Sequence, residues 1–228
     1  MENIEIIASE KHYIAVYKPA GILSQSAEGR TDGKDMVSLL SSLLGRAVFP
    51  VHRLDRETAG VMLYATDKVG ASKLSMLIAA GELHKTYLAV CEGALTDNAG
   101  ELHDLLYFDR KKNKSYVADK IRSGVKEAAL YYETLEKTDI DGKTCTLIRV
   151  KLYTGRTHQI RVQFASRKHP LVGDARYGSH SKMPLALFSH RIEFCDPFDG
   201  KPVSFVTLPT EQGTPFALFP RACGTPSV

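Results

Sequence analysis

Several features that would assign the chain to whole classes of protein are missing from its sequence. No apolar run approaches the roughly 20 residues that a membrane-spanning helix needs. The opening residues, MENIEIIASEKHY, are acidic where a secretory signal peptide would be basic. There is also no internal repeat, low-complexity tract or long linker. We therefore expect a soluble, cytoplasmic protein with no membrane contact, built as a single domain over residues 1–228 with a C-terminal tail from about residue 213.

Neither cysteine nor histidine is spaced as in a metal site. The four cysteines, Cys91, Cys145, Cys195 and Cys223, are far apart and form no CxxC pair. This spacing indicates neither a zinc knuckle nor a disulfide framework. The eight histidines show no HExxH or similar ligand pattern. We expect buried or half-buried thiols and no bound metal.

Positive charge is concentrated in one segment of an otherwise nearly neutral chain. Of 228 residues, 43% are hydrophobic and 25% charged, which is typical of globular proteins, and the formal net charge is +4. Residues 105–126 carry two acidic and seven basic side chains, a local net charge of +5, so the rest of the chain sums to −1. The basic side chains are Arg110, Lys111, Lys112, Lys114, Lys120, Arg122 and Lys126. Such a segment is either a solvated face or a contact for phosphates.

Three segments have helical patterns. Apolar residues recur at helical spacing over residues 35–44 and stop at Gly45. A second helix should follow Asp67, a favourable N-cap residue, and end at Gly81. The stretch THQIRVQFASRK predicts a third helix with Thr157 near its N-cap.

Strand patterns dominate the rest of the chain. The predicted strands cover residues 12–17, 60–66, 84–91, 127–136 and 144–153. Asp141-Gly142 separates the last two and is a strong hairpin signal. Because the strands come as hairpins with a few interspersed helices, we predict an α+β fold with a largely antiparallel mixed sheet and flanking helices.

Charged side chains crowd the segment directly before the second predicted strand. VHRLDRETAG, residues 51–60, places five ionisable side chains within six residues. These are His52, Arg53, Asp55, Arg56 and Glu57. Buried charges are costly unless they are matched, so a charged loop beside a core strand predicts at least one buried, paired charge.

Two further stretches are polar where a core would not require it. Lys85-Thr86-Tyr87 interrupts an apolar strand. GRTHQIR, residues 155–161, and HPLVGDARYG, residues 169–178, combine turn glycines with arginines, histidines and a glutamine near a helix start. The free N–H groups of a helix N-terminus suit an anion such as phosphate.

Together these stretches resemble the motifs of the RluA-type RNA pseudouridine synthases. HRLDRETAG is similar to that family's catalytic-aspartate motif, KTY to its tyrosine motif, and GRTHQIRV with HPLVGDARYG to its third signature. YKPAG, residues 17–21, resembles its N-terminal turn. The resemblance runs from about Tyr13 to about Phe205 and implies a pseudouridine synthase-like catalytic domain. It leaves no room for a separate N-terminal RNA-binding domain, because Asp55 lies so near the start.

The resemblance also implies roles for individual residues. Asp55 corresponds to the catalytic aspartate, Tyr87 to the tyrosine that packs on the target base, and Arg161 to the arginine that pairs with the aspartate. Arg53 corresponds to a residue that helps displace the target nucleotide from its helix. Further expected RNA contacts are His52, Arg56, Lys18, Arg156, His158, Gln159, Lys111 and Lys112.

Some of these positions have a second interpretation or depart from the family pattern. His52, His158 and His169 are more simply explained as hydrogen-bonded spacers than as acids or bases. Ala59 stands where a serine is common and Gln163 where a histidine is common. Neither departure changes the assigned acid.

The implied reaction detaches uracil from its ribose, rotates it and reattaches it through carbon. It involves no net hydrolysis or redox change, so no cofactor is expected. An ionised aspartate would act as nucleophile at the anomeric carbon or as base on the neighbouring carbon, and the sequence leaves both routes open. An arginine partner would keep a buried carboxylate charged, because guanidinium stays protonated and binds carboxylate with two hydrogen bonds.

Two other functions are compatible with parts of this pattern. A base-excising glycosidase would also use an aspartate beside a flipped nucleotide, and a non-catalytic RNA-binding or ribosome-assembly protein would keep the basic surface. The joint presence of Asp55, Tyr87 and Arg161 favours the isomerase. We expect structured RNA, ribosomal or transfer, as partner and a monomer as the simplest state.

Charge reversal tests the phosphate contact. Replacing Lys111 and Lys112 by glutamate should weaken RNA binding and flatten its dependence on salt, since fewer counterions are released. The measurement is the RNA dissociation constant over a series of salt concentrations. An unchanged affinity and salt slope would remove these lysines from the RNA contact.

Overall fold

A computed structural model describes residues 4–26 and 35–223 of the chain. The described chain divides into two compact units, which we call unit 1 and unit 2. Unit 1 comprises Met1–Lys85 and Ser189–Thr207, and unit 2 comprises Thr86–Phe188 and Leu208–Val228. The single domain expected from the sequence therefore contains two compact units, and the number of independently folding domains stays a prediction.

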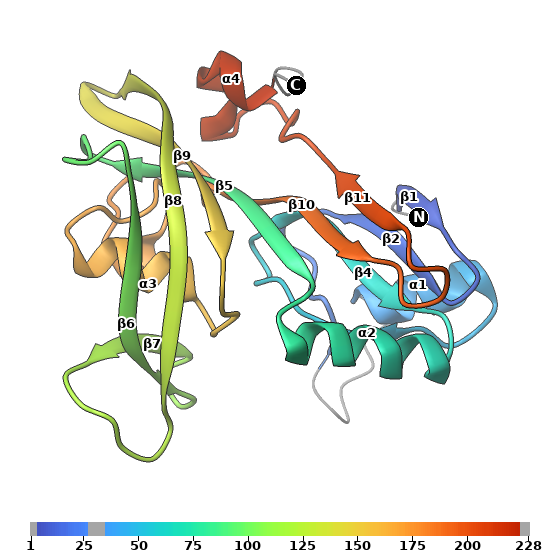
Figure 1. The fold of residues 1–228 in the computed structure, drawn as a ribbon. Coiled ribbons are helices and arrows are strands. Elements are labelled where there is room, and N and C mark those ends of the chain that lie inside the picture. The colour runs from blue at the N-terminus through green and yellow to red at the C-terminus, as the bar shows by residue number, and fades with distance from the viewer. Residues whose placement is uncertain (1–3, 27–34, 224–228) are drawn as a thin grey trace. The chain divides into compact units, whose positions relative to one another are not determined.

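Unit 1 contains a sheet with two helices (Figure 1). Its strands are β1 (Ile6–Ser9), β2 (Tyr13–Lys18), β3 (Phe49–Pro50), β4 (Ala59–Ala65), the part of β10 (Leu187–Cys195) from Ser189 onward, and β11 (Pro202–Val206). Its helices are α1 (Met36–Leu44) and α2 (Lys68–Ala80). The strand order is β1-β2-β4-β10, with β3 paired to β4 and β11 to β10. The pairs β1–β2, β2–β4, β3–β4 and β10–β11 are antiparallel.

The core of unit 1 forms around β4, in which all seven residues are buried. Val61 and Leu63 of this strand pack with Tyr13 of β2 and Phe194 of β10. Helix α2 adds Leu74 to the same cluster. The strand that follows the charged motif is therefore anchored in the centre of the unit.

Both helices of unit 1 begin and end where the sequence predicts. Asp35 and Asp67 are the N-caps of α1 and α2, and each carboxylate accepts a hydrogen bond from the amide three residues on, at 3.0 and 2.7 Å. Gly45 and Gly81 end the helices in the left-handed conformation, with φ of 63° and 76°. These local signals confirm both helix predictions.

Unit 2 contains five strands and four helical segments among its described residues. Its strands are the part of β5 (His84–Glu92) from Thr86 onward, β6 (Ala99–Asp109), β7 (Lys114–Ala118), β8 (Val125–Ile140) and β9 (Lys143–Leu152), in the order β5-β9-β8-β6-β7. Its helical segments are α3 (Gln159–Ser166), η1 (Ala175–Tyr177), η2 (Pro215–Leu218) and α4 (Pro220–Cys223). The pairs β6–β7, β6–β8 and β8–β9 are antiparallel. The prediction of an α+β fold with a largely antiparallel sheet is confirmed.

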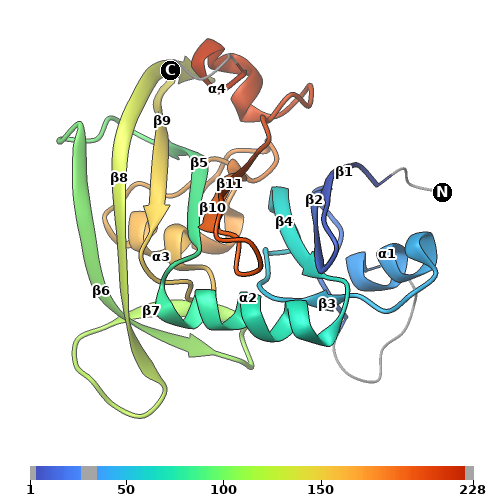
Figure 2. The same ribbon diagram turned by 45° about the vertical axis from the view of Figure 1, so that its right-hand side comes forward.

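The long β8–β9 hairpin turns at the predicted dipeptide. Asp141 and Gly142 both have positive φ, 50° and 73°, as a two-residue hairpin turn of type I′ requires. Helix α3 lies beside β6 and β7 (Figure 2). Its N-cap is His158, one residue later than Thr157, and His158 makes no side-chain cap hydrogen bond.

Strands β6 and β7 lie where the sequence showed mainly charge. The basic segment 105–126 covers the end of β6, the β6–β7 turn, β7, and the loop into β8. In the expected C-terminal tail, residues 215–218 and 220–223 are helical, and Phe216 and Phe219 are buried, while residues 224–228 lie outside the described part of the chain. Among the described residues, no helix combines the length and apolar character needed to cross a membrane.

Candidate active site

The loop that carries Asp55 is tied to the N-terminal YKPAG turn within unit 1. Arg56 Nε donates to the Gly21 carbonyl at 2.8 Å, and the Gly21 amide donates to the Arg56 carbonyl at 2.9 Å. Two residues before Arg56, the backbone of Leu54 forms a similar pair with the Ser24 hydroxyl, at 2.9 and 3.0 Å. The two motifs thus form one paired loop structure that presents Asp55.

A buried lysine holds these two loops together. Lys18 Nζ donates to the carbonyls of Pro19, Ile22 and Arg56 at 2.8, 2.7 and 3.1 Å. The side chain is fully buried, and an ammonium has three N–H donors, so all of them are engaged. Lys18 was predicted to contact RNA, but its burial and its three carbonyl partners give it a structural role instead.

The charge on Lys18 interacts with the HRLDRETAG motif. Burial lowers the pKa of Lys18 to about 8, and the nearby carboxylates of Glu57 and Asp55 act in the opposite direction. At neutral pH the ammonium therefore stays charged, with the Asp55 carboxylate among the groups that favour this charge. A buried, matched charge was expected among residues 52–57. The buried charge found beside this segment is the Lys18 ammonium, which belongs to β2.

Most charges of the HRLDRETAG motif itself lie at the surface. Arg53, Arg56 and Glu57 are exposed, and Asp55 is half-buried. The expectation of a buried charge within the motif was therefore wrong. Arg53 and Arg56 keep the exposure that an RNA contact requires.

His52 is the buried ionisable group of the motif. Its Nε2 accepts a hydrogen bond from the Leu63 amide of β4 at 3.1 Å. Burial, with a smaller contribution from the charge of Lys85, lowers the pKa of His52 to about 3. The imidazole is thus neutral at pH 7 and acts as a spacer between loop and strand, one of the two roles considered for it, and not as an RNA contact.

The glycine that ends the motif is required by close packing. Gly60 has φ +118°, and a Cβ atom at this position would lie 2.1 Å from the Ser189 carbonyl oxygen of β10. Any larger residue would displace the β10 backbone. The end of the Asp55 loop is therefore fixed by the packing of the sheet.

In unit 2, Arg161 is held by a buried carboxylate. Its Nε and Nη2 donate to the two oxygens of Asp174 at 2.7 and 2.8 Å, and both side chains are nearly inaccessible to solvent. This bidentate pair uses two of the five N–H donors of the guanidinium. The ring of Tyr177 lies 5.2 Å from the guanidinium carbon. The pair joins the two halves of the third motif, whereas the pairing of Arg161 with Asp55 stays a prediction.

Tyr177 links this pair to the basic hairpin. Its hydroxyl accepts from the Ser115 amide at 2.8 Å and is hydrogen-bonded to His158 Nδ1 at 3.0 Å. The Ser115 hydroxyl donates to the Thr157 carbonyl at 2.6 Å. Strand β7 is therefore anchored to the start of α3, and His158 has a structural partner in Tyr177.

Two predicted RNA contacts lie at the start of α3, Gln159 as its first residue and Arg156 in the loop before it. Gln159 is buried, and its Oε1 accepts from Thr154 Oγ1 and the Arg156 amide at 2.8 and 3.0 Å. Its Nε2 donates to the Ala129 carbonyl at 3.1 Å. Gln159 therefore shapes the loop and is not placed to contact RNA, while Arg156 is exposed.

The tip of the β6–β7 hairpin presents two of the predicted lysines. The amides of Lys111 and Lys112 donate to Asp109 Oδ1 at 2.9 and 3.1 Å, which fixes the turn. Both residues are exposed. The structure thus keeps these side chains accessible to phosphates.

Tyr87 and Gln163 are both buried in unit 2. Tyr87 lies on β5, as predicted, and is 6% exposed. Gln163 Nε2 donates to Asp104 Oδ2 at 2.8 Å, and Arg167 pairs with the same carboxylate at 2.8 Å. The glutamine at the family's histidine position thus joins a polar network with β6.

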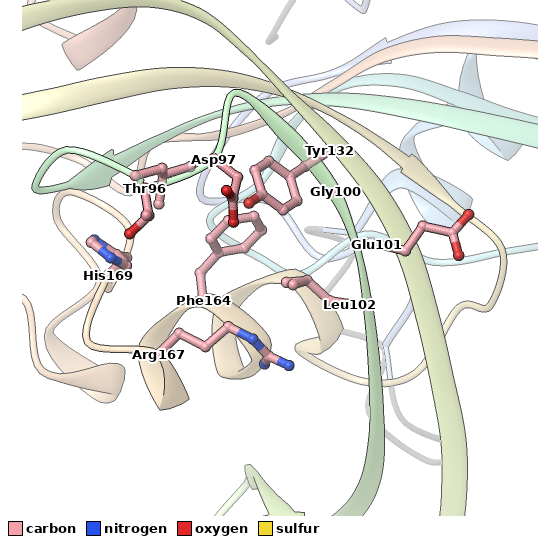
Figure 3. A pocket seen from close by; sticks show the side chains of 10 residues that line it. Thr96, Asp97, Gly100, Glu101, Leu102, Tyr132, Phe164, Arg167 and His169 are labelled. Atoms are coloured by element: carbon pink, nitrogen blue, oxygen red, sulfur yellow. The ribbon is translucent and has the colours of Figure 1, made fainter.

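A hollow of about 310 Å³ lies beside this network (Figure 3). Tyr132, Phe164, Arg167 and His169 line it, and Asp97 adds an acidic side chain. Because its charges are of both signs, the hollow has no evident preference for phosphate.

Comparison with known proteins assigns the chain to a family. Residues 12–166 match the RNA pseudouridylate synthase family. The chain is 32% identical to the tRNA pseudouridine synthase C of Vibrio vulnificus over 216 residues, 86% of each protein. It is 31% identical to the ribosomal large subunit pseudouridine synthase D of Xanthomonas campestris over 220 residues, which cover 88% of this chain and 64% of that protein.

A solved structure agrees on the fold. Human RNA pseudouridylate synthase domain containing 1 superposes with a TM-score of 0.76 at 22% identity, over 90% of this chain and 83% of that one. The chain belongs to the RNA pseudouridylate synthases. Within them it is of the RluA type, as its four motifs indicated.

Sequence reasoning missed the supporting roles of three residues. Lys18, Asp174 and Tyr177 each lie in a recognised motif, yet their partners come from distant segments. The available signal was that an arginine at a buried helix position requires a carboxylate, and Asp174 is the acidic residue of the adjoining motif.

The neutral buried imidazole predicts a pH effect on stability. An unfolded chain protonates His52 near pH 6.5 and the folded chain only near pH 3, so the unfolded state binds more protons between these values. The free energy of unfolding should therefore fall as the pH drops through this range, by about 1.4 kcal/mol per pH unit from this group. In His52→Gln this component should be absent.

Urea denaturation from pH 7 to pH 3 measures this difference between wild type and variant. The exposed His84→Gln variant controls for loss of a histidine as such. If the curves of wild type and His52→Gln ran parallel over the whole range, the neutral spacer role would be refuted.

Proposed function

We propose that this chain isomerises specific uridines in structured RNA to pseudouridine, with Asp55 as the residue that acts on the sugar. The chain belongs to the RNA pseudouridine synthase family. In its structure the aspartate of the HRLDRETAG motif is half-buried and lies in a loop that Lys18 fixes. That aspartate is the observation on which the proposal rests. Because the Arg56 carbonyl of this loop is bound by Lys18, the loop is already ordered. Its carboxylate can therefore act on a ribose without a prior rearrangement of the loop.

The proposed roles follow from the chemistry of each side chain. Asp55 acts as nucleophile at the anomeric carbon or as base on the adjacent carbon. Arg161 supplies a permanent positive charge for the ionised Asp55, and Asp174 orients that guanidinium. Tyr87 offers a flat face to the displaced base.

The RNA contacts are proposed for the exposed basic side chains. Arg53 and Arg56 flank the catalytic aspartate, Arg156 precedes α3, and Lys111 and Lys112 form the hairpin tip. Phosphate contacts offset the cost of a few kcal/mol for unstacking the target nucleotide. Arg53 is the side chain proposed to fill the space that the displaced target nucleotide leaves in the RNA.

The substrate is transfer or ribosomal RNA. Relatives of both kinds support this choice, since one is named a tRNA pseudouridine synthase and another a ribosomal large subunit pseudouridine synthase. The match to the tRNA pseudouridine synthase covers 86% of this chain and 86% of that protein, which favours transfer RNA as the substrate. We further propose that the protein acts as a monomer in the cytoplasm, where these RNAs are.

Replacing Asp55 tests the catalytic assignment. Asp55→Asn keeps the shape of the side chain but removes its charge, so pseudouridine formation should fall by about 10²- to 10⁴-fold or more. RNA affinity should stay within a few-fold of wild type. The matched control is Asp199→Asn, an exposed aspartate whose carboxylate pairs with Lys201.

The assay maps carbodiimide-reactive uridines in RNA from cells that lack the protein, after incubation with each variant. Mass spectrometry of the same RNA separates isomerisation, which leaves the mass unchanged, from base excision, which leaves abasic sites. An active Asp55→Asn enzyme would overturn the assignment, and abasic sites would favour a glycosidase.

A further inference from the structure

The β6–β7 hairpin of unit 2 presents two tyrosines side by side. Tyr107 and Tyr116 are direct cross-strand partners in the β6–β7 register. The neighbouring pair, Phe108 and Ser115, points to the other side of the ribbon, where it contacts the start of α3. Tyr107 and Tyr116 therefore lie on the face that α3 does not cover, and Tyr116 is 37% exposed.

A basic loop borders these rings. Gly124, with φ +80°, turns the segment after β7 so that it approaches the Tyr107 ring. The guanidinium carbon of Arg122 lies 5.6 Å from the centre of that ring, and Lys114 Nζ lies 5.7 Å from the centre of the Tyr116 ring. Both distances are within the range of cation–π contacts.

Rings and loop enclose a hollow of about 300 Å³. Its lining consists of the two tyrosines, the last two residues of β7, Val117 and Ala118, and the loop residues Asp119, Lys120 and Arg122. The volume is at the lower limit of pockets that hold small ligands, which start at about 300 Å³. Flat aromatic faces beside cationic groups match a nucleobase with its phosphate.

We propose that this hollow binds one unpaired nucleotide of the substrate RNA, distinct from the uridine that is isomerised. The base would stack on Tyr116, and Lys120 and Arg122 would contact its phosphate. The inference rests on the proposed function for the presence of RNA, and it adds a requirement for an unpaired base at a second point of the substrate.

Three observations favour RNA over a protein partner. The segment 105–126 that contains the hollow carries a net charge of +5 in a chain of +4. Stacking on an aromatic ring is the common way in which proteins hold unpaired bases. The hairpin is also anchored through Ser115 and Tyr177 to the motif that holds Arg161, so the hollow has a fixed place within unit 2.

The test compares Tyr116→Leu with Tyr116→Phe. Leucine removes the stacking face and keeps apolar bulk, whereas phenylalanine keeps the ring and removes only the hydroxyl. The probes are a fluorescent hairpin RNA with an unpaired loop and a fully paired duplex RNA of equal length. Since base stacking on an aromatic ring is worth about 1–3 kcal/mol, Tyr116→Leu should weaken binding of the hairpin RNA about tenfold. Tyr116→Phe should bind the hairpin RNA nearly as tightly as wild type, and neither variant should change binding of the duplex RNA.

Two results would overturn the inference. One is hairpin affinity in Tyr116→Leu equal to that of wild type, and the other is an equal loss for hairpin and duplex. Arg122→Gln is the second variant, and it should weaken hairpin binding without removing the rings. Because Tyr116 is exposed, circular dichroism should show the folded state of each variant.

Pseudouridine formation on cellular RNA separates this inference from the proposed function. A wild type that isomerises RNA, with an unchanged KM in Tyr116→Leu, would refute the second nucleotide site and leave the function standing. If the wild type formed no pseudouridine, but its affinity for the hairpin RNA fell in Tyr116→Leu, the proposed function would be refuted and the nucleotide site would stand.

Discussion

The Asp55 loop depends on one buried ammonium group. Lys18 reaches from the end of β2 to three backbone carbonyls, one of which belongs to Arg56, the residue after the aspartate. Hydrogen bonds to charged groups contribute about 1.5–3 kcal/mol each, and a buried carbonyl without a partner costs a similar amount. The loop can therefore keep its shape only while the lysine is present, and the lysine can stay buried only while the loop supplies its carbonyls. The same charge is favoured by the carboxylates of Glu57 and Asp55, so structural support and the proposed chemistry share one electrostatic environment.

Unit 2 uses a comparable device. Arg161 is fixed by a bidentate contact with Asp174, and Tyr177 packs beside the guanidinium while its hydroxyl holds β7. A single small cluster thus sets the orientation of the candidate arginine and the position of the basic hairpin. Breaking a buried ion pair by removing one partner typically costs about 3–5 kcal/mol, which makes this cluster sensitive to substitution. Each unit therefore fixes its own candidate residue, Asp55 in unit 1 and Arg161 in unit 2, with a buried charge that is matched within that unit.

The parts of the fold that the sequence predicts are those with local causes. The caps Asp35 and Asp67 and the Asp141-Gly142 turn act through neighbouring residues, so α1, α2 and the β8–β9 hairpin follow from the sequence alone. Lys18, His52 and Gln159 were expected to contact RNA because of their positions in the family's motifs and their charged or polar side chains. All three are buried, and their partners, which apart from the Thr154 hydroxyl are backbone groups, are brought together by the sheet or by a loop turn. Strands β6 and β7 were missed because only Leu102, Leu106 and Ser115 in them are buried, so they show no apolar alternation beside their charged residues.

The most direct measurement of the central claim is hydrogen exchange in Lys18→Met. Methionine fills a similar volume but offers no donors to the three carbonyls. We predict faster exchange of the Gly21, Leu54 and Thr58 amides, whose hydrogen bonds lie within the paired loops, with the amides of β8 and β9 unchanged. Exchange rates in these loops equal to those of the wild type would contradict the claim that Lys18 holds the aspartate's loop in place.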